Sequence, residues 1–296
     1  MQFRKMEGCG NDFVVLQAAS IASIQNDPAA FNEFVRRICD RHYGVGGDGL
    51  LAWESQQNDA GLHIRMHYWN ADGSRAEMCG NGARCVVRDA WEHAGQPPGP
   101  VLLQTDNGVR PVRINGSGNQ CMVAVDMGAA EWQPEKVPFR AEQPAVDIDM
   151  QLPGLANGVS ALSMGNPHAI VFIEESAHFA SLDLKKLGEP LATHARFPRG
   201  ANASFVHVEG DTLHLRVWER GVGPTLACGT ASCAALAAAR RTGRVNLEQV
   251  TVQLPGGSVQ VREDSDGHLW LEGPATLVAN GSLSSDWLAT RPLTAP

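Results

Sequence analysis

The sequence predicts an α+β fold that consists of two homologous, pseudo-symmetric domains. Two similar blocks lie half a chain apart, because Trp69 precedes Cys79 by ten residues and Trp218 precedes Cys228 by ten residues. A glycine follows each cysteine, and the two cysteines are 149 residues apart in a chain of 296. A repeat this long indicates a duplicated domain, since solenoid repeats are about 20–50 residues long. Strand-like runs outnumber helical ones, which favours α+β over a doubly wound sheet.

The first half predicts two helices among several strands. Phe31, Phe34, Val35 and Ile38 recur at helical spacing, which predicts a helix over 31–39. A second helix is predicted over 83–93, ending before Gly95. The segment 44–49 is glycine-rich and predicts a loop. Strands are predicted at 12–16, 50–53, 62–69, 101–105, 109–114 and 122–127.

The pattern restarts after a tract at 133–155, whose prolines and acidic residues predict a connection. Asn166 precedes an apolar run at 169–173, as Asn11 precedes the run at 12–16. A helix over 182–194 is expected to be interrupted at Gly188 and Pro190. An alanine-rich helix is predicted over 232–241, with Gly243 as its stop. Strands are predicted at 212–218, 250–254, 259–262 and 269–272.

Composition excludes several classes of protein. The formal net charge is −8 and no basic stripe is present, so nucleic acid is not expected as a partner. No apolar run reaches the roughly 20 residues of a membrane helix, and the first residues lack the apolar core of a signal peptide. We therefore expect a cytoplasmic protein without membrane contact. The odd count of 7 cysteines argues against a disulfide framework, and Cys39, Cys85, Cys121 and Cys233 are expected to be buried structural thiols.

The two Cys-Gly pairs predict acid–base chemistry. Each cysteine lies where a loop enters a helix, and the unpaired N–H groups of a helix start favour a thiolate and attract a carboxylate. Gly80 and Gly229 carry no side chain, so a ligand can approach the backbone there. If the two turns face each other, one thiolate can remove the proton next to a carboxylate while the opposite thiol supplies a new one. The result is inversion at that carbon, with no metal and no cofactor required.

Other interpretations of these cysteines fit less well. A covalent nucleophile needs a partner base and gives no reason for two matched turns. A zinc site is a poor match because the cysteines of each pair, such as Cys79 and Cys85, are flanked by helix-like residues. A thiol redox protein stays open as an alternative. Gly44, Gly46 and Gly49 match a dinucleotide fingerprint, but a helix precedes them and a strand follows, which is the wrong context.

Six stretches carry a resemblance to a known family, in the family's order. Two of them read Met78-Cys-Gly-Asn-Gly-Ala-Arg-Cys85 and Glu219-Arg-Gly-Val-Gly-Pro-Thr-Leu-Ala-Cys-Gly-Thr230, and the others lie at 5–13, 44–49, 70–74 and 164–168. The chain resembles diaminopimelate epimerases, which are pyridoxal-independent two-cysteine enzymes of lysine and peptidoglycan precursor biosynthesis. The resemblance implies that each domain is a mostly antiparallel sheet or barrel around a central helix, with the active site in the cleft between the domains. It also implies a homodimer.

The resemblance further implies domain limits, a reaction and a set of site residues. The first domain would span 1–124 plus 275–296 and carry Cys79, and the second would span 125–274 and carry Cys228. The substrate would be a small amino acid, LL-2,6-diaminopimelate, converted to the meso form by these two cysteines as acid and base. Gly80, Asn81, Gly229 and Thr230 would hold the reacting carboxylate, and His168 would orient the substrate. The remaining substrate-binding residues would be Asn11, Asn70, Asn166, Asn202, Glu219 and Arg220.

A few positions depart from the family pattern. Pro224 replaces the usual acidic residue, Ala231-Ser232 replaces Gly-Ala, and Gly49 lacks the glutamine side chain of some members. These departures leave open a related racemase that acts on another amino acid, of the proline or histidine type. The pair Glu219-Arg220 favours diaminopimelate, because a proline-type substrate has no second zwitterionic end to bind.

Overall fold

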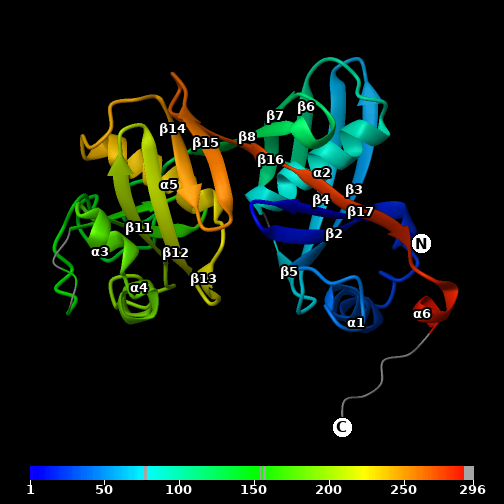
Figure 1. Ribbon diagram of the computed structural model, residues 1–296, viewed down its shortest axis with the longest axis horizontal. Coiled ribbons are helices and arrows are strands. Elements are labelled where there is room, and N and C mark those ends of the chain that lie inside the picture. Colours follow the sequence, from blue (N-terminus) through cyan, green and yellow to red (C-terminus); the bar gives the residue numbers. More distant parts are fainter. Residues whose placement is uncertain (77–78, 154, 156–157, 290–296) are drawn as a thin grey trace, which may run out of the picture. The chain divides into compact units, whose positions relative to one another are not determined.

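The computed structural model describes residues 1–76, 79–153, 155 and 158–289. Met78 of the block at 78–85 and the last residues of the segment 275–296 therefore lie outside the described residues. The chain divides into two compact units, one formed by Met1–Val125 with Gly273–Pro296 and the other by Asp126–Glu272 (Figure 1). We call them unit 1 and unit 2. Among the residues described, every helix is too short or too polar to span a membrane.

Unit 1 is a curved, mixed sheet. Its strands are β1 (Gln2–Gly8), β2 (Asn11–Gln17), β3 (Gly49–Asn58), β4 (Gly61–Asn70), β5 (Arg75–Ala76), β6 (Val101–Thr105), β7 (Gly108–Asn115), β8 (Met122–Ala129), which extends past the unit's limit, and β17 (Thr276–Ser282). Most neighbours are antiparallel, including the hairpin of β1 with β2 and the pairing of β17 with β1. Two pairings are parallel, β2 with β3 and β4 with β6.

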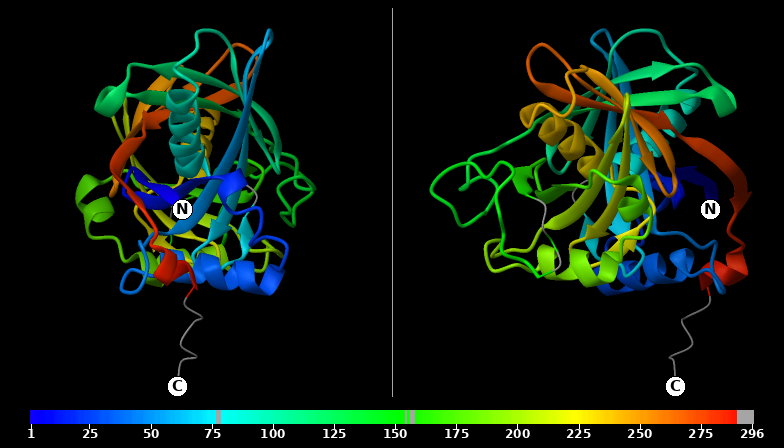
Figure 2. Two further views of the ribbon diagram at one scale, coloured as in Figure 1. Left: turned by 90° about the vertical axis from the view of Figure 1, so that its right-hand side faces the viewer. Right: turned by 60° about the vertical axis from the view of Figure 1, so that its left-hand side comes forward.

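The helices of unit 1 have separate roles. Helix α2 (Gly80–His93) packs against β1, β2, β3 and β4, and its first eleven residues are buried. Helix α1 (Pro28–Cys39) begins at Asp27, whose carboxylate caps the first N–H groups, and packs on β2 and β3. The short helix α6 (Ser285–Ala289) lies beside α1, where Trp287 meets Phe34 at 6.2 Å between ring centroids (Figure 2). Two 3₁₀ turns complete the unit, at Ala18–Ser20 and Gly118–Gln120.

Unit 2 repeats this arrangement. Its strands are β9 (Val159–Ser163), β10 (Pro167–Phe172), β11 (Asn202–Glu209), β12 (Thr212–Glu219), β13 (Gly223–Thr225), β14 (Gln249–Leu254), β15 (Gly257–Glu263) and β16 (His268–Pro274), whose last residues leave the unit. The helices are α3 (Ser176–Ala180), α4 (Leu184–Ala192) and α5 (Gly229–Arg241). Helix α5 packs against β9, β10, β11, β12 and β15, and it is buried on nearly all sides, as expected for its small alanine side chains.

The strand registers show that the two units are copies of one plan. Phe13 pairs with Gly49 across the parallel strands β2 and β3, and His168 pairs with Asn202 across the parallel strands β10 and β11. A second parallel pair, β4 with β6, recurs as β12 with β14. In both units the long buried helix follows a short strand, β5 or β13. The predicted α+β class with two similar halves is confirmed.

Several elements were not expected from the sequence. Strands β1, β9, β11 and β17 were not predicted, and both buried helices begin three residues earlier than expected, at Gly80 and Gly229. The start of β11, Asn202 to Val206, is buried at every position. It therefore lacks the alternation that marks a half-buried strand.

The predicted interruption of the helix over 182–194 was wrong. Helix α4 runs without a break through Gly188 and Pro190, and Asp183 caps its first turn. Leu187 and Leu191 lie on the buried face of this helix. Gly188 is placed against Trp218, where an added Cβ would come within 2.6 Å of the Trp218 Cβ atom. Packing against β12 therefore outweighs the low helix propensity of both residues.

The contact of Gly188 with Trp218 predicts that two substitutions in α4 change the free energy of unfolding in opposite directions. Gly188→Ala should lower the free energy of unfolding by about 1–3 kcal/mol, because the new methyl group overpacks against Trp218. Pro190→Ala, at an exposed position of the same helix, should raise it by about 1–2 kcal/mol, because the helix regains a backbone donor while the unfolded chain gains some freedom. Urea unfolding of both variants measures the difference. A stabilised Gly188→Ala variant would show that propensity governs this helix.

Candidate functional site

Cys79 is the N-cap of helix α2. Its backbone is extended, with φ −142° and ψ 119°, and its Sγ accepts a hydrogen bond from the Gly82 N–H at 3.5 Å. Gly80 is the first residue of the helix. A Cβ at Gly82 would lie 3.1 Å from the Leu51 side chain, so the first turn packs closely on β3. The thiol therefore lies over the unpaired N–H groups of the helix, which favour negative charge.

Two asparagine side chains lie next to the Cys79 thiol. The Asn11 Oδ1 atom is 3.6 Å from Cys79 Sγ and accepts from Asn81 Nδ2 at 3.4 Å. Asn81 is in turn held by Arg84, whose Nη2 donates to Asn81 Oδ1 at 3.0 Å. Arg84 is fully buried and also donates to the carbonyl oxygens of Gly80 and Pro274. Asn11, Cys79, Gly80 and Asn81 are thus brought together within unit 1.

Asn70 is engaged in a turn of its own. Its Nδ2 donates to Ser74 Oγ at 2.9 Å, and its backbone N–H donates to the Ser74 carbonyl at 2.9 Å. Asn70 pairs with Gly49, which pairs in turn with Phe13, so Asn70 lies at the same sheet edge as Asn11. Its side chain is thus occupied by Ser74, although its strand ends close to the other site residues.

Cys228 occupies the corresponding position on helix α5. It is the N-cap, with φ −135° and ψ 110°, and its Sγ lies 3.5 Å from the Thr230 hydroxyl. That hydroxyl accepts from Asn166 Nδ2 at 3.4 Å, and Asn166 Oδ1 lies 2.9 Å from His168 Nε2. Four of the residues expected in the second domain therefore form one hydrogen-bonded chain, which begins at the thiol and ends inside unit 2.

The Glu219 carboxyl is a second neighbour of the Cys228 thiol. Burial raises the pKa of Glu219, while hydrogen bonds from Thr225 and from the Cys228 thiol act in the opposite direction. The Thr225 hydroxyl donates to Glu219 Oε1 at 2.6 Å. A carboxylate whose pKa is raised accepts a proton more readily, so Glu219 is suited to take up the proton of the neighbouring thiol.

Asn202 holds the backbone of Arg220, the residue that follows Glu219. Asn202 Oδ1 accepts from the Arg220 backbone N–H at 2.9 Å, which fixes the turn after β12. The Arg220 side chain is exposed, and its Nη1 donates to the Arg199 carbonyl at 3.1 Å. Gly200, with φ +68°, lies against the Arg220 side chain, where a Cβ would be 3.2 Å from it. The guanidinium is therefore held at the surface, where it can contact a carboxylate.

His168 lies in the interior of unit 2. It is fully buried, and burial, with the charge of Arg220, lowers its pKa to about 3. Its Nε2 bonds to Asn166, and within the described part of the chain its buried Nδ1 has no hydrogen-bond partner. The ring is therefore neutral at physiological pH, and it contacts the Cys228 surroundings through Asn166.

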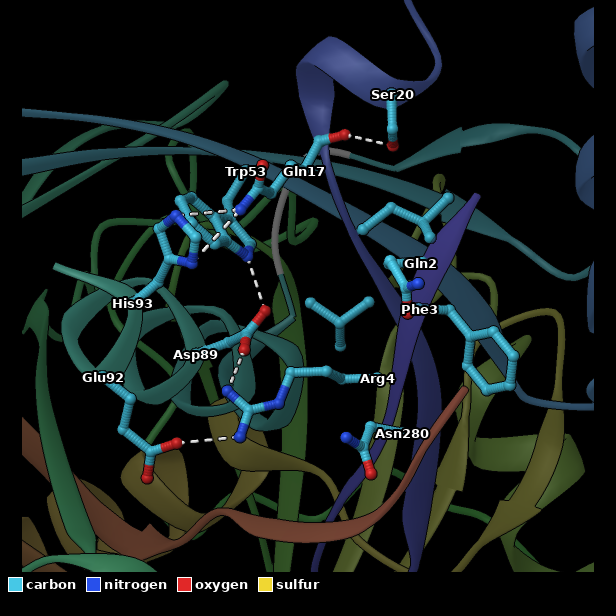
Figure 3. A pocket seen from close by; sticks show the side chains of 12 residues that line it. Gln2, Phe3, Arg4, Gln17, Ser20, Trp53, Asp89, Glu92, His93 and Asn280 are labelled. Carbon is cyan, nitrogen blue, oxygen red and sulfur yellow. Dashed lines mark hydrogen bonds and ion pairs between the residues drawn. The ribbon is translucent and has the colours of Figure 1, made fainter. Parts of the chain in front are cut away.

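A large pocket in unit 1 lies elsewhere. It has a volume of about 670 Å³, and its lining includes Arg4, Trp53, Asp89 and Glu92 (Figure 3). Arg4 bonds to both carboxylates, and the Trp53 Nε1 donates to Asp89 at 2.7 Å. Asp89 and Glu92 belong to the end of α2 opposite to the one that Cys79 caps, so this pocket is separate from the Cys79 surroundings.

Three residues of the site were not singled out from the sequence. Asp48 accepts from Asn11, Arg84 holds Asn81, and Thr225 holds Glu219. Asp48 and Thr225 are brought to their partners by strand pairing, which a single sequence does not show. Arg84 follows Asn81 by three residues, a helical spacing that could have indicated the contact.

The buried His168 generates a prediction for stability. The unfolded chain binds a proton at this ring below about pH 6.5, whereas the folded chain does so only near pH 3, so stability falls as the pH decreases between these values. His168→Gln should remove this effect. Between pH 6.5 and 4.5 the free energy of unfolding of the wild type should fall by about 2 kcal/mol relative to His168→Gln. Urea unfolding across this range measures it, with the exposed His42→Gln variant as control, and parallel curves for wild type and His168→Gln would contradict it.

Comparison with known sequences covers nearly all of the chain. The family model for diaminopimelate epimerase matches residues 3–133 and 160–278. Diaminopimelate epimerase of Desulfitobacterium hafniense is 38% identical over 296 residues, which is 98% of this chain and 100% of the relative. The enzyme of the same name from Alkalilimnicola ehrlichii is 40% identical over 291 residues, which is 97% of this chain and 99% of the relative.

Solved structures share the fold at much lower identity. A hydroxyproline epimerase from Agrobacterium vitis superimposes with a TM-score of 0.64 and 14% identity, over 95% of this chain and 90% of the other. A protein from Pseudomonas aeruginosa described as a predicted epimerase gives a TM-score of 0.65 and 16% identity, over 95% and 98%. These likenesses establish the architecture, and the sequence relatives establish the kinship. The chain therefore belongs to the diaminopimelate epimerase family and is an isomerase, as its motifs predicted.

Proposed function

We propose that this protein converts LL-2,6-diaminopimelate to meso-2,6-diaminopimelate without a cofactor, with the thiols of Cys79 and Cys228 as its acid and base. One observation carries the proposal. Both cysteines are N-caps of buried helices at equivalent positions of a structural repeat. A single thiol at a helix start has many uses, but two matched ones suit a reaction that removes and returns a proton on opposite faces of one carbon.

The proton transfer balances within this pair. One cysteine, as thiolate, takes the proton from the α-carbon, and the electron pair of the broken C–H bond moves into the adjacent carboxylate. The other cysteine, as thiol, then gives its proton to the opposite face of the same carbon. The product has the inverted configuration, and the two cysteines have exchanged protonation states. The N–H groups at the starts of α2 and α5 stabilise the negative charge on the carboxylate during the reaction.

The neighbours of the thiols support distinct roles. We assign the reacting carboxylate to the first residues of the two helices, Gly80-Asn81 and Gly229-Thr230. Glu219 is placed to accept the proton of Cys228, which would leave that cysteine as the thiolate. His168 would act as a positioning residue, because it reaches Thr230 through Asn166.

The distal end of the substrate is an amino acid zwitterion. We assign its binding to Asn11, Asn70, Asn166, Asn202, Glu219 and Arg220, since amides offer both a donor and an acceptor and an arginine can clamp a carboxylate. We also propose that the units correspond to the domains 1–124 plus 275–296 and 125–274, and that the protein acts as a cytoplasmic homodimer in lysine and peptidoglycan precursor biosynthesis.

Solvent deuterium tests the reaction directly. Purified protein, freed of metal ions and of pyridoxal phosphate, should incorporate deuterium from D2O at the α-carbon of diaminopimelate while it interconverts the LL and meso forms. Mass spectrometry and chiral chromatography detect the two changes. Proline and histidine, tested in parallel, should stay unlabelled. Labelling of one of them in place of diaminopimelate would show that the substrate assignment is wrong, and no labelling at all would refute the reaction.

Substitution of cysteines separates catalytic from structural thiols. Cys79→Ala and Cys228→Ala should each lower the rate of epimerisation by more than about 100-fold, because each removes one proton-transfer group. Cys85→Ala and Cys233→Ala are matched controls on the same two helices, and both side chains are fully buried. These controls should retain activity and lose about 1–2 kcal/mol of stability. Equal losses of activity in all four variants would contradict the pairing of Cys79 with Cys228.

A further inference from the structure

The amide of Asn11 is held in one orientation. Its Nδ2 donates to Asp48 Oδ2 at 2.5 Å, while its Oδ1 faces Cys79 Sγ and Asn81 Nδ2. A carboxylate can only accept hydrogen bonds, so the NH2 group of Asn11 must point to Asp48. The carbonyl oxygen of Asn11 is consequently the end that faces the thiol.

Asn81 is fixed in the same way from the opposite side. The guanidinium of Arg84 can only donate, so it must meet the oxygen of Asn81, and the distance is 3.0 Å. The NH2 group of Asn81 is then directed to Asn11 Oδ1. Asp48, Asn11, Asn81 and Arg84 thus form a chain with an acceptor at one end and a donor at the other, which leaves each amide a single orientation.

Asp48 is itself well anchored. Its N–H donates to the Asp12 carbonyl at 2.7 Å, and its own carbonyl accepts from the Ala71 N–H at 3.2 Å. Arg41 donates to Asp48 Oδ1 at 2.9 Å and to both oxygens of Asp12. Although burial would raise it, hydrogen bonds from Arg41 and Lys5 lower the pKa of Asp12 to about 2. The Asp12 carboxylate therefore stays ionised throughout the physiological pH range and keeps its ion pairs with Lys5 and Arg41.

We propose that Asp48 is a positioning residue for the Cys79 half of the site. Its charge-assisted contact with Asn11 at 2.5 Å is stronger than the contact of Asn81 with Asn11 at 3.4 Å, so Asp48 is the main group that keeps the Asn11 carbonyl oxygen facing the thiol. The inference rests on the proposed role of Cys79. An oxygen can accept from the S–H group but gives nothing to a thiolate, so this contact favours the protonated form of Cys79. The Gly82 N–H favours the thiolate. A reversed Asn11 amide would place a second donor at the sulfur and remove this balance.

Alkylation of Cys79 measures the contact without substrate. The full-length protein is treated with iodoacetamide at pH 7, and mass spectrometry follows the peptide that contains Cys79. Asp48→Asn is the conservative variant, because it removes the charge yet keeps an oxygen that can accept from Asn11. Asp48→Ala removes both. The rate of Cys79 alkylation in Asp48→Ala divided by the rate in Asp48→Asn therefore reports the orientation of Asn11 apart from charge. We expect Asp48→Ala to react roughly 3 to 10 times faster, because a reversed Asn11 amide donates to the thiolate and the effect has the size of one hydrogen bond.

A double-mutant cycle decides whether Asp48 acts through Asn11. In an Asn11→Ala background the same ratio should fall to about 1, since the oriented group is gone. A ratio near 1 with Asn11 intact, or an unchanged ratio in the Asn11→Ala background, would overturn the inference. Asp106→Ala is the matched control, because it also removes a carboxylate that is paired with an arginine, Arg75 at 2.9 Å. Cys79 in this variant should be alkylated at the wild-type rate.

Epimerase activity gives a second, separable readout. Asp48→Ala should lower kcat about tenfold relative to Asp48→Asn with little change in KM, the effect of a misplaced proton-transfer group rather than of lost substrate contacts. Equal kcat values for these two variants would also contradict the inference. If the wild type shows no epimerase activity, the proposed function fails, whereas the alkylation ratios still decide the orientation of Asn11.

Discussion

The chemistry of both halves depends on one backbone constraint: each cysteine must be the last extended residue before a buried helix. For Cys79 this conformation brings Sγ within 3.5 Å of the Gly82 N–H, one of the groups with no partner within the helix, whereas the Cys228 side chain makes no capping hydrogen bond among the described residues of its helix. One residue further along, the side chain would join the helical spiral and move away from these groups. The burial of α2 and α5 inside their sheets fixes where each helix begins, so the packing of each unit determines the position of its thiol.

The two units repeat the backbone but not the neighbours of the thiol. Cys79 meets an amide oxygen of Asn11 and the Gly82 N–H, and neither group can take up a proton. Cys228 meets the Thr230 hydroxyl and the Glu219 carboxyl, whose pKa is raised by burial. A carboxyl of this kind can hold the proton of the thiol, whereas an amide cannot. The repeated fold therefore supplies two equivalent positions for a thiol, and these neighbours of the two thiols among the described residues differ in their chemistry.

Periodicity and turn residues predicted those parts of the fold whose signal lies in adjacent residues. The repeat, the helix over 31–39 and the stops at Gly95 and Gly243 could be predicted, because spacing and glycine placement are local. Strand β17 could not, since its largely exposed residues are ordered by pairing with β1, 269 to 280 positions away in the chain. The continuous helix α4 could not be predicted either, because it depends on the packing of Gly188 against Trp218, which belongs to strand β12.

The same distinction holds for the site. The two cysteines and their glycines were visible as a pattern, because a helix start has a short signature. The contact of Asn11 with Asp48 joins residues 37 positions apart, and it arises only when β2 lies parallel to β3. Similarly, Glu219 meets Thr225 through the antiparallel pairing of β12 with β13. Reactive groups can thus be found from sequence, whereas the groups that orient them depend on strand register.

The departures from the family pattern are explained by local packing rather than by a new substrate. A Cβ at Gly49 would lie 2.5 Å from the Trp69 carbonyl oxygen, so a side chain there would require a shift of β4. The Ser232 hydroxyl is buried and bonds back to the Cys228 carbonyl at 3.0 Å, within the helix. Pro224 is exposed on β13, opposite Trp218. All three act on backbone or surface and leave the Glu219 carboxyl, the Thr230 hydroxyl and both thiols in place. The Arg220 guanidinium is likewise unaffected, so the proposed contact with the distal carboxylate of the substrate is retained.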